Sequence, residues 1–184
     1  MSCGVPGYGT RQQRLFYERI AAAYAPDGVL LVMHWNDGQL HRDEVVATYR
    51  EPSGVVTGNP TLVWNLAAAD SAAHERTNDL QMDQIGLELG RLDAAVRANG
   101  ARLAIVLFRN DSDPGWASLS ATVSSVLGVE GVPILDLGET LLAAAASQDL
   151  RVHESDPHPN EIAHRLAAEE IAVFLRRNDL VPAR

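Results

Sequence analysis

The sequence predicts one α/β domain in which a parallel sheet has helices on both faces, a three-layer α/β/α arrangement. Segments with helical periodicity alternate with short apolar runs along the chain. Two of these runs, at residues 28–34 (GVLLVMH) and 103–108 (LAIVLF), are continuously apolar. Such runs are typical of strands buried on both faces of a parallel sheet. We find no internal repeat or linker, so the 184 residues are expected to form a single domain.

Composition excludes several classes of protein. The net charge of -9 argues against a nucleic-acid-binding protein, which needs clustered basic residues. All 15 basic residues are arginine, which we interpret as a bias of the genome's composition. Cys3 is the only cysteine, which excludes an internal disulfide and a cysteine-based zinc site. No apolar run approaches the roughly 18 residues that a membrane-spanning helix needs, so no such segment is expected.

The first part of the chain predicts a strand, a turn, a helix and a second strand. Residues 1–5 are a short apolar stretch, followed by a turn rich in Gly and Pro at residues 4–10. We expect Thr10 to cap a helix that reaches about Tyr24. The apolar strand at residues 28–34 then ends in the turn signal Trp35-Asn36-Asp37-Gly38.

Residues 39–77 carry no clear periodicity, and the piece at residues 51–60 (EPSGVVTGNP) is rich in turn-forming residues. We interpret residues 39–77 as an insertion or lid-like loop, because long loops in compact domains are usually functional or mobile.

Regular elements are predicted again from Asn78. A helix from Asn78 is closed by Asn99-Gly100. It is followed by the strand at 103–108, a helix over about 116–127, a strand at 132–137, an Ala-rich helix over about 139–147 and a last helix over about 160–177. The inner face of the last helix is expected to carry Ile162, Leu166, Ile171, Phe174 and Leu175.

Three clusters of polar residues and glycines fall where ligands bind in parallel sheets, beyond the carboxyl ends of the strands. They are residues 4–10, residues 36–37 and residues 156–158. In the last cluster, a carboxylate at Asp156 could fix the tautomer of His158 and stabilise its protonated form, as a general base for acyl transfer requires. The alternative is a helix cap with an ordinary surface histidine.

The other two clusters offer hydrogen-bond donors for an oxyanion. The side-chain amide of Asn36 could donate to negative charge that develops on a carbonyl oxygen. Gly7 could present its backbone N–H to the same oxygen, because a residue without Cβ lets the backbone approach a ligand closely. The alternative for both residues is a simple turn.

Together these motifs resemble those of the SGNH/GDSL-type hydrolases. The segment GVPGYGT at residues 4–10 resembles the family's second block, with Gly7 at the oxyanion-hole glycine. Asn36-Asp37 after the apolar strand resembles the third block, with Asn36 at the oxyanion-hole asparagine. The segment DPHPN at residues 156–160, followed by Ala163-His164, resembles the final block, which carries the catalytic Asp and His ahead of the last helix.

The resemblance implies a flavodoxin-like parallel sheet and a Ser-His-Asp mechanism. It implies that His158 and Asp156 are catalytic and that Gly7 and Asn36 form the oxyanion hole. The reaction would be hydrolysis of a carboxylic ester or O-acetyl group on a small-molecule or carbohydrate substrate. This chemistry needs no metal or organic cofactor, so none is expected.

The chain departs from the family's pattern at four places. Ser155, not an acid, stands three residues before His158, so Asp156 gives a D-x-H variant of the usual D-x-x-H. His34-Trp35 and Ala163 replace glycines. No Gly-Asp-Ser turn occurs anywhere, so the chain has no identifiable nucleophile.

In a flavodoxin-like sheet the strands lie side by side in the order 2-1-3-4-5. The missing Gly-Asp-Ser turn would follow strand 1, which would lie between the strands expected at residues 1–5 and 28–34. Loss of strand 1 would leave two apolar strands with unpaired edges. We therefore expect an N-terminally truncated, inactive SGNH-like domain, either a gene fragment or a chain whose start is misassigned at Met1.

Two other functions remain open from the sequence. A binding module derived from such a hydrolase would keep the pocket without turnover. A metal site could use His153, Asp156, His158 and His164, although His158 and His164 do not have a recognised chelating spacing.

Overall fold

The computed structural model describes residues 8–34, 37, 71–109 and 115–181. Within these ranges the chain is a mixed α/β domain with a three-stranded parallel sheet and five α-helices. Gly7, Asn36 and residues 1–5 lie outside the described residues, as does most of the segment expected to be an insertion. Residues 71–77 of that segment belong instead to a helix.

The sheet consists of β1 (Gly28–Met33), β2 (Arg102–Leu107) and β3 (Ile134–Asp136), side by side in that order. All pairs are parallel, and the register pairs Met33 with Leu107 and Leu107 with Asp136. The carboxyl ends of the three strands therefore form one row. Loops that follow them emerge at the same edge of the sheet, where ligands bind in this class of fold.

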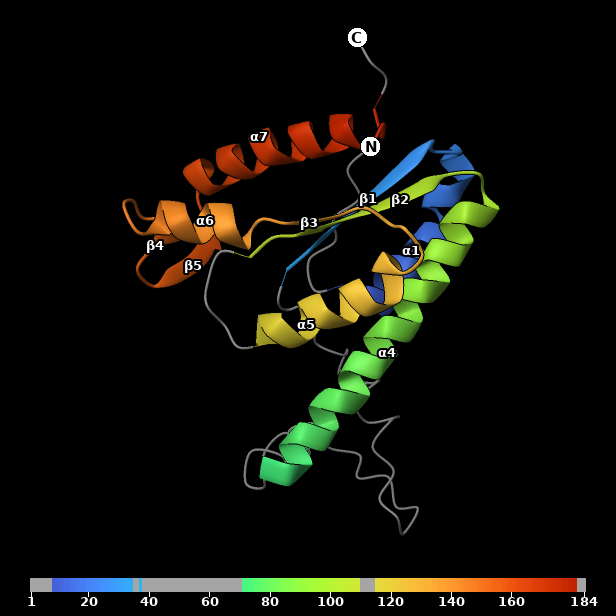
Figure 1. Ribbon diagram of the computed structural model, residues 1–184, viewed down its shortest axis with the longest axis horizontal. Helices are drawn as coiled ribbons and strands as arrows, with labels where there is room; N and C mark the ends of the chain where they lie inside the picture. Colours follow the sequence, from blue (N-terminus) through green and yellow to red (C-terminus); the bar gives the residue numbers. More distant parts are fainter. Residues whose placement is uncertain (1–7, 35–36, 38–70, 110–114, 182–184) are drawn as a thin grey trace.

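Helices cover both faces of β2, because its side chains alternate between two apolar clusters. Leu103, Ile105 and Leu107 pack with residues of α1 (Thr10–Arg19), α4 (Ser71–Ala98) and α5 (Gly115–Val123). Ala104 and Val106 pack with residues of α6 (Gly138–Ala145) and α7 (Glu161–Arg177). Figure 1 shows α4 and α5 on one side of the sheet and α6 and α7 on the other. The two-sided burial predicted for this strand is confirmed.

For β1 the same prediction is wrong on one face. Leu30 is 36% exposed and Val32 is 43% exposed, whereas Met33 is buried. The reason is that β1 is the last strand on its side of the described sheet, and the α6–α7 cluster packs on β2 and β3, not on Leu30 and Val32.

The first helix is shorter than predicted. Gly9, not Thr10, is the N-cap residue of α1, and the helix ends at Arg19. A 3-10 turn, η1 (Ala21–Tyr24), follows and closes at Ala25, which has a positive φ of 46°. The hydroxyl of Thr10 is not available for capping because it donates to the carbonyl oxygen of Asp37 (3.0 Å).

The later elements follow the predicted order closely. α4 ends before Gly100, which has a φ of +76° that favours glycine over other residues. A five-residue π-helix, η3 (Ser124–Gly128), continues α5. A β-hairpin of β4 (Arg151–His153) and β5 (Asp156–Pro159), which was not predicted, precedes α7. Among the described helices, none combines the length and apolar character needed to cross a membrane.

Candidate functional site

Asp156 and His158 meet on β5 of the β4–β5 hairpin. The Oδ1 atom of Asp156 lies 2.5 Å from Nδ1 of His158, and it also accepts a hydrogen bond from the backbone N–H of His158 (3.1 Å). The hydrogen bond from the imidazole is the main reason that the pKa of Asp156 is lowered from its ordinary value. The pair that the sequence predicted is therefore brought together.

The contact selects one form of the imidazole. A carboxylate with a lowered pKa is ionised at neutral pH and can only accept hydrogen bonds. The proton between the two groups must then be on Nδ1 of His158, which leaves the lone pair of a neutral ring on Nε2. The side chain of His158 is 83% exposed, so this ring can reach a ligand from solvent. Such a ring can accept a proton from an attacking hydroxyl group.

Asn160 joins this hairpin to α7. Its Oδ1 accepts hydrogen bonds from the backbone N–H groups of Ile162 (3.0 Å) and Ala163 (3.1 Å), which makes it the N-cap of α7. Its Nδ2 donates to the carbonyl oxygens of Asp149 (2.9 Å) and Arg151 (3.0 Å). Asn160 thus fixes the start of the hairpin to the start of the helix.

The start of α7 in turn lies against the carboxyl end of β2. The rings of His164, in α7, and Phe108, directly after β2, are 5.8 Å apart. The Asp156–His158 pair is therefore attached next to the row of strand ends, the place that the sequence predicted. Figure 1 shows the hairpin beside α6 at one end of the sheet.

The junction of α1 and β1 is the second polar cluster near the strand ends. The carboxylate of Asp37 accepts hydrogen bonds from the backbone N–H of His34 (2.6 Å) and from Nε2 of Gln13 (2.8 Å). Its backbone carbonyl accepts from Thr10. Burial raises the pKa of Asp37 from its ordinary value, although the two donors act in the opposite direction.

This junction brings together the two segments that were predicted to carry the oxyanion donors. Thr10 lies three residues after Gly7, and Asp37 directly follows Asn36. Gly7 and Asn36 themselves lie outside the described residues, so their roles stay predictions. Sequence reasoning missed Gln13 and the carboxylate of Asp37, because a contact across 24 residues leaves no local signal in the sequence.

The alternative metal site is not formed. Among the described residues, no three His, Cys, Asp or Glu side chains are placed to hold a metal ion together. Nδ1 of His153 lies 2.9 Å from the hydroxyl of Ser155, and the His164 ring contacts Phe108. Of the four candidate side chains, those of Asp156 and His158 contact one another.

Comparison with known proteins gives no match: no family model, no curated protein sequence and no solved structure is significantly similar to this chain. The residues of the chain itself therefore carry the argument about function.

Proposed function

We propose that this chain carries the acid–base pair and the oxyanion-hole segments of an SGNH/GDSL-type ester hydrolase. The observation that carries the proposal is the 2.5 Å contact between Nδ1 of His158 and Oδ1 of Asp156 on an exposed hairpin. The substrate class is a carboxylic ester or an O-acetyl group on a small molecule or carbohydrate. The arrangement of helices on both faces of β2 is compatible with a three-layer, flavodoxin-like sheet in which β1, β2 and β3 are the third, fourth and fifth strands.

In the proposed mechanism, Nε2 of His158 accepts the proton of a serine hydroxyl while the serine oxygen attacks the ester carbonyl. Asp156 stabilises the imidazolium that forms. The backbone N–H of Gly7 and the amide of Asn36 donate to the tetrahedral oxyanion. His158 then gives its proton to the leaving alcohol, and water hydrolyses the acyl-enzyme by the same steps.

The serine is not identified in this chain, since its 184 residues contain no Gly-Asp-Ser turn. We propose that the chain alone is inactive as an esterase. A histidine without a nucleophile cannot form the covalent intermediate.

The second candidate is a ligand-binding module that keeps the pocket and does not turn over its ligand. The absence of a Gly-Asp-Ser turn favours it as much as it favours an inactive fragment. Thermal unfolding distinguishes the two. A cooperative melt of the chain would favour a true binding module, whereas a fragment that lacks a central strand would unfold gradually or aggregate.

The experiment that tests the proposed site is an NMR titration of the chain with butyrate, a short carboxylate of the kind the reaction would release. We expect the ring signals of His158 and the amide signals of Thr10 and Asp37 to shift together, because both segments border the proposed site. The amide signal of Val129, an exposed residue outside both segments, is the control and should not shift. Signals that do not move at either segment would contradict the proposal.

A fluorophosphonate probe tests the missing nucleophile separately. We expect no serine of the chain to be labelled and no burst of p-nitrophenol from p-nitrophenyl butyrate. Labelling of one serine that disappears in His158→Ala would show that the nucleophile lies in this chain.

A further inference from the structure

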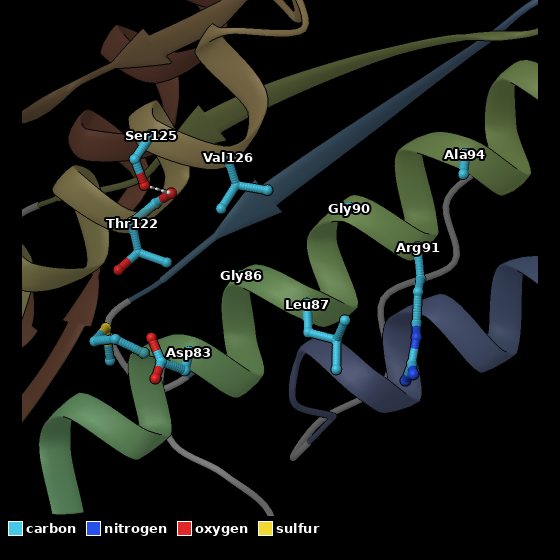
Figure 2. Close-up of a pocket in the computed structure, with 10 residues that line it drawn as sticks. Asp83, Gly86, Leu87, Gly90, Arg91, Ala94, Thr122, Ser125 and Val126 are labelled. Atoms are coloured by element: carbon cyan, nitrogen blue, oxygen red, sulfur yellow. Dashed lines mark hydrogen bonds between the residues drawn. The ribbon is translucent and has the colours of Figure 1, made fainter. Parts of the chain in front are cut away.

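An open groove lies on the opposite side of the sheet from α6 and α7. The groove lies between α4 and the α5–η3 pair and has a volume of about 620 Å³. Figure 2 shows it along α4, with Gly86 and Gly90 facing the side chains of Thr122 and Val126. The glycines let η3 approach closely, since a Cβ at Gly86 would lie 3.0 Å from Val126.

Three residues of α4 form a stripe along this groove. Asp83, Leu87 and Arg91 are spaced four apart, so they lie on one face of the helix. Leu87, at the centre, is 46% exposed, which is high for a large apolar side chain on a helix. Asp83 is exposed and makes no ion pair with the residues that the structure describes. Arg91 is half exposed and bonds Glu88 through Nη1 (2.7 Å), which leaves its other N–H groups available.

The order of charges on the stripe, negative–apolar–positive, is complementary to itself in one orientation only. If a second α4 runs antiparallel and Leu87 lies on the two-fold axis, Asp83 of each copy faces Arg91 of the other. A parallel pair would place Asp83 against Asp83 and Arg91 against Arg91. We infer that the groove binds a second copy of this chain through an antiparallel α4–α4 contact centred on Leu87.

The apolar part of this contact fits the same geometry. Asp83, Gly86, Leu87 and Gly90 have the spacing of the four residues that form a hole for a side chain of a facing helix. Two of the four are glycines, and Val126 of η3 lies against both of them, so this side chain forms one wall of the hole. The hole can receive Leu87 of the second copy, which removes the leucine side chain from water in both chains.

The length of α4 gives independent support. Its 28 residues span about 42 Å at the usual rise per residue. Figure 1 shows that its first turns extend beyond α5. In the antiparallel pair centred on Leu87, residues 76–98 of each α4 lie along the same residues of the other, so the contact covers most of the helix after its first turn.

A charge-swap series on the full chain tests this inference, with the mass of the particle in solution as the readout. We expect the wild type to be dimeric. Asp83→Arg should raise the dissociation constant about tenfold or more, because it places four arginines around the axis. The double variant Asp83→Arg/Arg91→Asp reverses every charge and should restore the dimer. A circular dichroism melt checks that each variant folds.

A cysteine variant locates the axis. Cys3→Ser removes the native thiol, and Leu87→Cys then places one thiol next to its symmetry mate. Oxidation should link Leu87→Cys chains into dimers faster than chains with Val129→Cys, a more exposed position outside α4. A wild type that stays monomeric, a double variant that does not recover, or equal cross-linking at both positions would overturn the inference.

Discussion

The α1–β1 junction and the β4–β5 hairpin each hold an aspartate near the strand ends, but by different contacts. The carboxylate of Asp37 accepts a hydrogen bond from Gln13, which is 24 positions away in the sequence. Its backbone carbonyl accepts one from Thr10, which is 27 positions away. Asp156 is bonded by His158, two positions away, and both side chains face solvent. Burial raises the pKa of Asp37, whereas the hydrogen bond from His158 lowers the pKa of Asp156.

The difference suits the two roles in the proposed site. Donors to an oxyanion act best when they are fixed in advance, so they belong on a segment that is tied to the core. A general base has to reach a ligand, so its ring can stand on an exposed hairpin if one neighbour fixes its tautomer. We therefore expect the contacts of Asp37 at the junction to contribute more to stability than the exposed Asp156–His158 pair.

The largest expected effect is on stability at the junction. Asp37→Ala removes the acceptor for the backbone N–H of His34 and for Gln13 in a largely buried place. We expect the free energy of unfolding in urea to fall by about 1–3 kcal/mol. Asp156→Ala is the matched control, and it should lower the unfolding midpoint much less, because its carboxylate is exposed and its hydrogen bonds are formed in solvent. Equal losses in the two variants would remove the distinction between the regions.

Substitution of Asn160, which joins the hairpin to α7, should lower the free energy of unfolding by a smaller amount. Asn160→Ala removes the helix cap and both bonds to the hairpin, which should cost about 1–2 kcal/mol of unfolding free energy. Asn160→Asp keeps the capping oxygen but loses the amide donors to Asp149 and Arg151. It should therefore retain most of the stability and increase the motion of Arg151, which 15N relaxation measures. If both variants lose the same amount of unfolding free energy, the capping oxygen of residue 160 contributes nothing to stability.

Much of the fold could be predicted from local pattern. The apolar run of β2, the glycine after α4 and the polar start of α7 each depend on neighbours in the sequence, and the structure confirms them. The Asp156–His158 contact is also local, since two residues of one strand form it.

What the sequence did not predict depends on distant contacts. Thr10 was expected to be the N-cap, but its hydroxyl donates to the carbonyl oxygen of Asp37. The N-cap is Gly9, and Thr10 is the first residue of the helix. The exposed face of β1 depends on which helices reach it, and its apolar residues carry no sign of that. Nothing in the sequence around Gln13 indicated a role for it, because its partner Asp37 is brought close only by folding.

The two carboxylates should affect stability with opposite dependence on pH. The pKa of Asp37 is raised above 3.8, so the folded chain binds this proton more tightly than the unfolded chain. Its contribution to stability therefore falls as the pH rises from 3.8 through the folded pKa and is constant above it. The pKa of Asp156 is lowered, so its contribution is present above 3.8 and is lost as the pH falls through the folded pKa.

Unfolding in urea between about pH 3 and 6 measures both effects. As the pH falls, the stability of the wild type should rise relative to Asp37→Asn and decline slightly relative to Asp156→Asn. The same sign for the two variants would contradict the assigned burial of Asp37 or the bond to Asp156.

The state of the His158 ring tests the central claim most directly. We would record the ring 15N chemical shifts of the neutral side chain in the wild type and in Asp156→Asn, with His153 as an internal reference. If Asp156 holds the ring as the structure indicates, the wild type carries its proton on Nδ1 of His158, and Asp156→Asn loses this preference. A proton on Nε2 in the wild type, unchanged by Asp156→Asn, would contradict the account, because Nε2 could not then act as the base.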